Sequence, residues 1–198
     1  MKKVEIIILV ICCLTAYTVY SQTLKKTHTM IEQKEYPKAL VDYDDFKNLV
    51  IELEKQRAGH LISLDAFLKM SQEKNTVIFD TRSDYRFNRK HLKGAIHLDF
   101  TDFTQENLLK LIPDTTTKIL IYCNNNFDGD QIDFASKVAR PEKNMETQIL
   151  SNRKPIMLAL NIPTHINLYG YGYKNIYELD ELVNVNDTRI KFEGTVVK

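Results

Sequence analysis

"TVIFDTRSDYRFNRKHLKGAIHL", residues 76–98, contains two short apolar runs separated by a polar segment. The first run, TVIFD (76–80), is rich in β-branched residues, and the second, GAIHL (94–98), follows after the charged segment. Short apolar runs of this kind are typical of strands that are buried on both faces, as in a parallel sheet. The stretch therefore predicts two strands of an α/β domain.

Further strand and helix candidates alternate on both sides of this stretch. Short apolar runs predict strands at 60–63, 76–80, 94–98, 118–123 and 174–179. Helical spacing predicts helices at 39–57, 64–72, 105–112 and 130–139, with Ser63 as the cap of the second and Pro113 ending the third. The helix over 39–57 ends near Gly59 and is expected to dock on the main domain. Strands that alternate with helices predict a parallel sheet with helices on both faces.

Length and charge limit the class of protein. The chain has 198 residues, of which 43% are hydrophobic, which fits one globular domain with an appendage. Its formal net charge of +1 gives no electrostatic reason to expect nucleic acid binding. No residue pattern indicates a cofactor.

The N-terminus has the features of a signal peptide. Lys2 and Lys3 supply a positive start, the apolar run Ile6–Leu14 follows, and Val19 and Ser21 occupy the −3 and −1 positions of a cleavage site. We predict a signal peptide over residues 1–21, cleavage after Ser21, and a periplasmic or secreted protein. The apolar run is shorter than the ~20 residues of a membrane span, so none is expected in the mature chain; an uncleaved anchor is the alternative.

Cleavage would leave a single cysteine. It would remove Cys12 and Cys13, and a lipid on either is disfavoured because neither follows a small residue. The mature chain would then hold only Cys123 and no internal disulfide. The remaining thiol is a candidate for chemistry.

Eight residues of the opening stretch form an ordered pattern: Asp80, Arg82, Phe87, His91, Leu92, Gly94, Ala95 and Ile96. The pattern resembles the rhodanese-like domain, in which Asp-x-Arg ends one strand and His-x-x-Gly-Ala leads into the next. ILIYC (119–123) resembles the strand that delivers the family's nucleophilic cysteine, and GYKNIYEL (172–179) resembles the last strand. The resemblance covers roughly residues 60–182. It implies the rhodanese-like α/β fold over 59–198, after the N-terminal extension 22–58.

The resemblance also suggests roles for the motif residues. Asp80, Arg82, His91 and Gly94 are interpreted as structural, because residues away from the reactive atom usually position the backbone. Asp80 ends a strand, where its carboxylate can accept hydrogen bonds from loop amides. Gly94 allows a turn that a side chain would obstruct. Cys123 is the candidate nucleophile, which in active members of the family becomes a persulfide.

The loop after Cys123 is the expected anion cradle. Its members are Asn124, Asn125, Asn126, Phe127, Asp128 and Gly129. In active members the loop wraps amide N–H groups around the sulfur at a helix N-terminus, which lowers the thiol pKa and binds oxyanions. Asn124, Asn126, Asp128 and Gly129 also match part of a calcium loop, but Ala135 stands where its last acid belongs, so no metal is predicted.

This loop lacks the basic residue that active members carry. Asp128 and Asp130 stand five and seven residues after Cys123, and no Arg or Lys occurs before Lys137. Carboxylates there would repel a dianion and raise the thiol pKa, unless Arg86 or Arg89 compensates.

Two functions remain for the domain. The favoured one is a binding or regulatory module of the bacterial cell envelope with weak or no sulfurtransferase activity. The alternative is sulfur transfer through a Cys123 persulfide, and a phosphatase is disfavoured. The partner would be an unknown protein or a small thiol or sulfane sulfur donor.

The segment 140–173 is longer than the family's usual connection. It predicts an extra strand or core segment over 156–162 and a short helix from a Thr164 cap to Gly170. His165 is expected to be a cap or surface residue rather than a ligand. Tyrosines at 169, 171 and 173 form either an aromatic binding surface or packing over the sheet edge.

Overall fold

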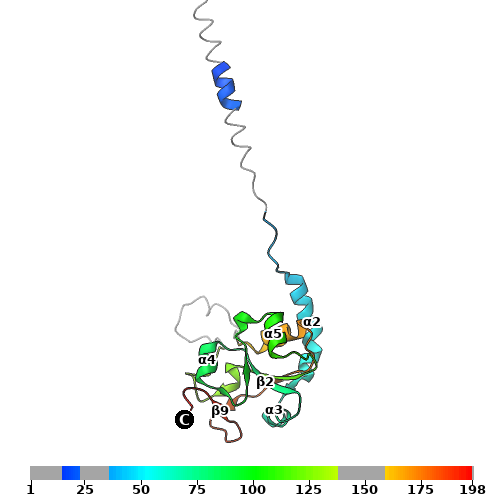
Figure 1. The fold of residues 1–198 in the computed structure, drawn as a ribbon, viewed down its shortest axis with the longest axis vertical. Helices are drawn as coiled ribbons and strands as arrows, with labels where there is room; N and C mark the ends of the chain where they lie inside the picture. The colour runs from blue at the N-terminus through cyan, green and yellow to red at the C-terminus, as the bar shows by residue number, and fades with distance from the viewer. Residues whose placement is uncertain (1–14, 23–35, 138–158, 198) are drawn as a thin grey trace, which may run out of the picture. The chain divides into compact units, whose positions relative to one another are not determined.

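The computed structural model describes residues 15–22, 36–137 and 159–197 (Figure 1). Contacts divide the chain into the units Met1–Asp42 and Tyr43–Lys198. In the first unit, residues 15–22 are helical, and most of the predicted signal peptide, residues 1–14, lies outside the described residues. No helix in the described ranges is long and apolar enough to cross a membrane.

A five-stranded parallel sheet forms the centre of the second unit. Its strands are β1 (Leu61–Ile62), β2 (Thr76–Asp80), β4 (Ile96–His97), β5 (Lys118–Tyr122) and β7 (Ile176–Leu179). The order across the sheet is β1-β7-β5-β2-β4, and every pair is parallel. The α/β fold predicted from the sequence is confirmed, and all five predicted strands are present, several of them shorter than expected.

Helices cover both faces of the sheet. They are α2 (Tyr43–Gly59), α3 (Leu64–Met70), α4 (Asp84–Arg89), α5 (Gln105–Leu111) and α7 (Asn161–Gly170). In Figure 1, β2 runs between α5 and α3. The cap of α3 is as predicted, because Ser63 Oγ accepts a hydrogen bond from the backbone N–H of Ala66 at 3.3 Å.

The alternation of side chains along β5 separates two cores. Ile119 and Ile121 pack with residues of α5 and α7, such as Leu108 and Leu168. Leu120 and Tyr122 point to the opposite face and pack in a second cluster that includes Phe67 of α3. Because successive side chains of a strand point to opposite faces, a buried strand needs apolar residues at every position. ILIY (119–122), the buried part of β5, meets this requirement, and half-buried Lys118 begins the strand.

Two short strands follow β7 and were not predicted. β8 (Val183–Asn184) pairs with β6 (Phe127–Asp128), and β9 (Phe192–Glu193) pairs with β3 (His91–Leu92). Two-residue strands are too short to show a period in the sequence. The C-terminal segment therefore holds both the loop after Cys123 and the segment after α4.

The N-terminal helix is shorter than predicted. α2 begins at Tyr43 rather than at residue 39, and Leu40 is fully exposed. Leu53 is the buried residue of α2. The helix contacts α7, and its Arg57 forms an ion pair with Glu178 of β7 at 2.8 Å.

The helix predicted over 130–139 is wrong for residues 130–137, which form turns. One helical hydrogen bond is present, from the N–H of Phe134 to Asp130 O, but side chains take several other backbone groups that a helix would pair. Arg86 donates to the carbonyl of Ile132, and Arg82 donates to the carbonyl of Asp133. The N–H of Ser136 donates to Gln131 Oε1, and the N–H of Lys137 donates to Asn125 Oδ1. Residues 138–139 lie outside the described ranges.

α7 begins three residues before the predicted cap. Thr164 is buried inside the helix, and its hydroxyl forms a 2.7 Å hydrogen bond with the hydroxyl of Thr81. Pro163 is tolerated because it lies in the first turn, where its missing N–H has no helical partner. Of the two alternatives over 156–162, the strand is wrong at 159–162, because residues 161–162 are helical and residues 159–160 precede the helix. The core-facing alternative is confirmed at Ala159 and Asn161, which are buried, and residues 156–158 lie outside the described ranges.

The three tyrosines at the end of α7 and just after it pack against the domain. The hydroxyl of buried Tyr173 donates to Ile112 O at 2.7 Å, and that of half-buried Tyr171 donates to Phe103 O at 3.3 Å. Tyr169 donates to Glu52 at 2.7 Å. These contacts favour packing over an aromatic binding surface.

Candidate functional site

Cys123 lies directly after β5, at the carboxyl edge of the sheet. Its backbone is extended, and the residue is 1% exposed. The carboxyl edge of a parallel sheet is where α/β proteins usually bind ligands, because the loops that leave the strands meet there. The thiol is therefore in a position typical of a functional residue, but it is nearly closed to solvent.

The sulfur is contacted by an amide from a distant segment. The backbone N–H of Leu160 donates to Cys123 Sγ at 3.3 Å, and α7 begins at the following residue. The N-terminus of a helix carries a partial positive charge that favours a thiolate. The predicted helix N-terminus at the sulfur is thus supplied by α7 rather than by a helix directly after the loop.

Burial decides the acidity of the thiol. It raises the pKa of Cys123, and the N–H groups of Leu160 and Asn124 act in the opposite direction. The charge of Asp80 raises the same pKa and the charge of Arg82 lowers it, so the two members of this ion pair act in opposite directions. The neutral thiol is the main form at neutral pH.

Asparagine side chains hold the loop in shape. Asn126 Oδ1 accepts hydrogen bonds from the N–H of Cys123 at 2.9 Å and from Asn161 Nδ2 at 2.8 Å. Asn126 Nδ2 donates to Leu179 O at 2.6 Å, and Asn124 Oδ1 accepts from Arg82 at 3.4 Å. Asn125 Oδ1 accepts from the N–H of Lys137, as described above. The asparagine run thus connects the loop to the strand ends and to α7.

Most amides of the predicted cradle are used inside the loop. The N–H of Asn126 donates to Cys123 O, that of Phe127 donates to Asn124 O, and that of Gly129 donates to Asp128 Oδ1. Asn124 is the residue of this loop that, with Cys123, lines the adjoining cavity. Phe127 is buried against Phe134, whereas Asp128 is exposed. The cradle consists of the amides of Asn124 and Leu160.

The charges around the cysteine differ from those expected from the loop sequence. A cavity of about 330 Å³ adjoins Cys123 and is lined by the cations Arg82, Arg86 and Lys137 and one carboxylate, that of Asp99. Neither Asp128 nor Asp130 lines it, and Asp130 forms an ion pair with Lys90 at 3.0 Å. The repulsive carboxylates expected next to the sulfur are thus directed elsewhere.

The two arginines considered as compensating cations have different positions. Arg86 lines the cavity, while Arg89 forms an ion pair with Asp133 at 2.5 Å and does not line it. Lys137 also lines the cavity, although its place at the end of the loop in sequence did not indicate this. The sequence pattern predicted a helix over these residues and so did not indicate this position. Residues 130–137 are not helical, and Lys137 lines the same cavity as Cys123.

The motif residues form a framework around this cavity. Arg82 and Asp80 are a buried ion pair with a shortest distance of 2.7 Å, and Arg82 also donates to Lys90 O at 2.7 Å. His91 Nδ1 is 2.7 Å from Phe87 O, and Gly94 has φ +79°. Of these four motif residues, Arg82 alone lines the cavity.

His165 is placed differently from the prediction. It is fully buried in α7, and neither ring nitrogen has a hydrogen-bond partner among the described residues. Its Nδ1 is 3.7 Å from Glu178 Oε2. His165 lies inside α7, which begins at Asn161, and on the buried side of that helix.

No set of side chains in the described ranges forms a metal centre. Groups of three or more His, Cys, Asp or Glu residues placed to hold a metal ion do not occur there. Asn124 and Asn126, which matched a calcium loop in sequence, direct their side-chain oxygens to Arg82 and to the N–H of Cys123.

A parallel α/β domain with one cysteine after its central strand is the arrangement that rhodanese-like domains have. The family described as "Rhodanese-like domain" matches residues 63–181 of the chain. The chain belongs to the rhodanese-like domain family, as the sequence motif predicted.

Relatives of known name share part of the chain. The tRNA uridine(34) hydroxylase of Streptococcus pneumoniae (strain Hungary19A-6) is 30% identical over 107 residues, which cover 52% of this chain and 31% of the relative. The chain thus spans less than a third of that relative's length.

Solved structures of similar fold include two sulfur-related proteins. A rhodanese with anions from E. coli is 14% identical with a TM-score of 0.35, covering 61% of this chain and 99% of that one. The polysulfide-sulfur transferase homodimer of Wolinella succinogenes is 13% identical with a TM-score of 0.35, covering 75% and 97%.

Proposed function

We propose that the protein is a slow sulfurtransferase in which Cys123 carries sulfur as a persulfide. The observation that carries this proposal is the environment of Cys123 Sγ, which accepts the N–H of Leu160 beside a cavity lined by three cations and one carboxylate. The loop sequence argued against sulfur transfer because two carboxylates follow Cys123. Neither Asp128 nor Asp130 lines the cavity, which supports the proposal.

The transfer requires no redox cofactor. The Cys123 thiolate attacks the outer sulfur of a donor R–S–SH, a new S–S bond forms at Cys123, and the donor's S–S bond breaks to release RS⁻. The product is Cys123–S–SH. An acceptor thiolate then attacks the outer sulfur and regenerates the Cys123 thiolate. The N–H groups of Leu160 and Asn124 stabilise the sulfur anion in both steps.

The charges of the cavity favour a donor with a single negative charge. Arg82 is neutralised by its buried pair with Asp80, which leaves Arg86 and Lys137 against Asp99. The remaining balance is one positive charge. It matches a donor R–S–SH whose R group carries one carboxylate better than a dianion such as thiosulfate. The raised pKa of Cys123 makes the attacking thiolate scarce at neutral pH, so transfer is slow.

The test is the loading of Cys123 with sulfur. Full-length protein is incubated with cysteine persulfide or thiosulfate, and intact mass reports the gain of one sulfur atom. Wild type should load from the persulfide faster than from thiosulfate, and Cys123→Ser should not load. Failure to load from any donor would refute the proposal.

Position 160 gives a matched control for the role of the amide. Leu160→Pro removes the N–H that contacts the sulfur, and the φ of −83° at this position is close to the range of proline. Leu160→Ala keeps the N–H. Loading at neutral pH should fall about tenfold in Leu160→Pro, because a hydrogen bond to a charged group is lost. Leu160→Ala should load like wild type.

The second candidate is a binding or regulatory module with weak or no sulfurtransferase activity. It is favoured by the closed thiol, which is 1% exposed and has a raised pKa. This candidate predicts that a cross-linked complex with a cell-envelope protein forms equally well with wild type and with Cys123→Ser. A complex that requires the thiol would argue against it.

We also propose that the protein is exported to the cell envelope and that its signal peptide is cleaved after Ser21. The support is the sequence of residues 1–21, with its positive start, apolar run and small residues at the cleavage site. The N-terminal sequence of the protein isolated from an envelope fraction should begin at Gln22. A chain that keeps Met1 and stays with the cytosolic fraction would contradict export.

A further inference from the structure

The outer edge of β2 has no strand partner over its first half. β5 pairs with all five residues of β2 on one side, from Thr76 to Asp80. On the other side, β4 has two residues and pairs only with Phe79 and Asp80. Three residues of a central strand, 76–78, therefore form an open sheet edge among the described residues.

The backbone groups at this edge face away from β5. In a parallel sheet, alternate residues direct their N–H and C=O groups to opposite neighbours. Asn75 O accepts from Lys118 N on the β5 side, and Asp80 O accepts from Leu98 N on the β4 side. Three backbone groups therefore point to the open side: the N–H of Thr76, the carbonyl of Thr76 and the N–H of Ile78. β4 does not extend far enough to pair with any of them.

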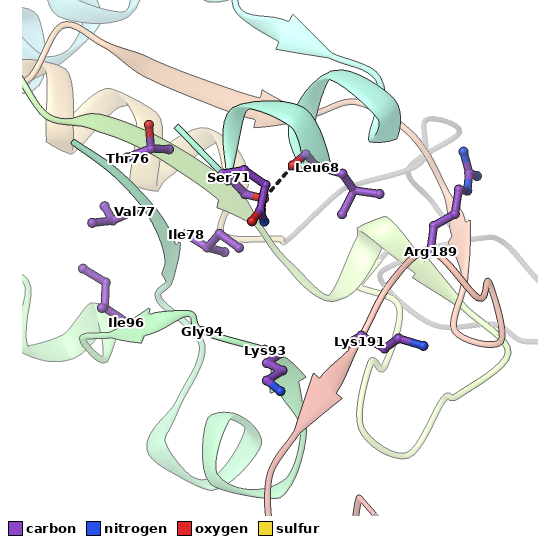
Figure 2. Close-up of a pocket in the computed structure, with 11 residues that line it drawn as sticks. Leu68, Ser71, Thr76, Val77, Ile78, Lys93, Gly94, Ile96, Arg189 and Lys191 are labelled. Atoms are coloured by element: carbon purple, nitrogen blue, oxygen red, sulfur yellow. Dashed lines mark hydrogen bonds between the residues drawn. The ribbon is translucent and has the colours of Figure 1, made fainter. Parts of the chain in front are cut away.

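A cavity of about 440 Å³ lies along this edge (Figure 2). Its apolar lining includes Leu68 of α3, Val77 and Ile78 of β2, and Ile96 of β4. The hydroxyl of Thr76 also belongs to the lining, and it is buried without a hydrogen-bond partner among the described residues. The cavity thus combines apolar surface with unused hydrogen-bonding groups.

The charged side chains of the cavity are all basic. They are Lys93, Lys191 and Arg189. Figure 2 shows all three to the right of Ile78. Arg189 already forms ion pairs with Asp65 and Asp187 at 2.6 Å each. No ion pair of Lys93 or Lys191 occurs within the described ranges, although Lys93 helps to lower the pKa of Glu193. Two lysines are thus available to an occupant.

We propose that this edge binds an extended acidic segment of a partner protein, which adds to the sheet as a strand beside Thr76–Ile78. Strand addition to an open edge supplies main-chain hydrogen bonds, and side-chain pockets select the sequence. The apolar lining fits aliphatic side chains that alternate with the acidic ones. Lysines at an edge also disfavour pairing with a second copy, because the same positive charges would meet.

This inference is independent of Cys123 and of sulfur transfer. The probe is a capped peptide, Glu-Val-Glu-Ile-Glu, and the control peptide has lysine in place of each glutamate. Full-length protein is titrated with both, and amide hydrogen exchange of Thr76 and Ile78 is measured by NMR. The acidic peptide should bind and slow exchange at both amides, and the basic peptide should bind at least about tenfold more weakly.

Charge reversal tests the two lysines. The double variant Lys93→Glu/Lys191→Glu should weaken binding of the acidic peptide about tenfold or more, while Lys55→Glu, an exposed change on α2, should leave it unchanged. Binding without protection of the two amides would overturn the proposal, as would equal binding of both peptides or none of the acidic one. Self-association that protects Thr76 and Ile78 would overturn it in favour of a second copy.

Discussion

Arg82 holds the carboxylate of Asp80 in a two-point contact, with Nε 3.0 Å from both oxygens and Nη2 2.7 Å from Oδ2. Both side chains are buried, and the hydroxyl of Tyr122 donates to the same carboxylate. The guanidinium also donates to the carbonyls of Lys90 and Asp133. One arginine thus connects the end of β2 to the end of α4 and to the turn after the cysteine loop.

Breaking this pair is expected to destabilise the domain strongly. Arg82→Met leaves the buried Asp80 carboxylate without its cation and should cost about 3–5 kcal/mol of unfolding free energy, measured by urea denaturation. The double variant Asp80→Asn/Arg82→Met should cost less than the sum of the two single variants, because it removes both charges. Arg189→Met, at an exposed pair, is the control and should have a much smaller effect. If the loss in the double variant equals the sum of the losses in the two single variants, the two charges do not stabilise each other.

The reactivity of Cys123 should require a higher pH in the folded protein than in the unfolded one. Burial raises the thiol pKa, so the thiolate forms only at higher pH. Alkylation by iodoacetamide, followed at Cys123 by peptide mass mapping, should show a rate midpoint that moves to lower pH when the protein is unfolded in urea. A midpoint equal in both states would contradict the inferred environment.

The same shift predicts a pH dependence of stability. A thiol whose folded pKa lies above its unfolded value stabilises the fold fully below the unfolded pKa, and the contribution is lost as pH rises through the folded pKa. Stability measured from neutral to alkaline pH should therefore fall more for wild type than for Cys123→Ser, which cannot ionise there. Parallel pH profiles would show that the thiol does not contribute.

Two glycines with positive φ should respond differently to alanine. Gly194 has φ +135°, and a Cβ there would collide with the carbonyl oxygen of Arg89. Gly94 has φ +79° with nothing near a Cβ. Gly94→Ala should cost about 1 kcal/mol from backbone conformation alone, while Gly194→Ala should cost clearly more and unpair β9 from β3. Equal losses of thermal stability in the two variants would contradict the close approach of Gly194 to the Arg89 carbonyl.

Replacing His165 should not destabilise the domain. Both of its ring nitrogens are buried without hydrogen-bond partners among the described residues, and the 3.7 Å from Nδ1 to Glu178 Oε2 is too long for a hydrogen bond. His165→Leu therefore removes two unsatisfied polar groups. Stability in urea should stay within about 1 kcal/mol of wild type or rise. Thr164→Val is the matched control, because it removes a hydroxyl that does have a partner, Thr81, and should cost about 1 kcal/mol. A large loss in His165→Leu would indicate a partner for the imidazole.

The sequence predicted the centre of the fold because that part is decided locally. TVIFD and KILIY are apolar through their middle positions, as strands buried on both faces must be, and both form strands with these bounds. The position of Cys123 at the end of β5 follows directly from the second run. The cap at Ser63 needed only a polar residue before a helical pattern.

The remainder of the site depends on contacts between distant residues, which local patterns do not contain. Leu160 contributes its N–H to Cys123 across 37 positions, and it does so only because α7 docks on the sheet. The helix expected over 130–139 was lost to Arg82 and Arg86, whose side chains take its carbonyls from another part of the chain. Tertiary contacts overrode local helical preference there.

β8 pairs with β6 and β9 pairs with β3, so the folded domain extends beyond the region that resembles the family. The matched region ends at residue 181, yet Val183 pairs with Phe127 inside the cysteine loop, and Phe192 packs its ring against the ring of Phe127. β8 thus pairs with the cysteine loop, and β9 pairs with the strand that follows α4. A fragment trimmed at residue 181 would keep every motif of a rhodanese-like domain and lose the shape of its cysteine loop.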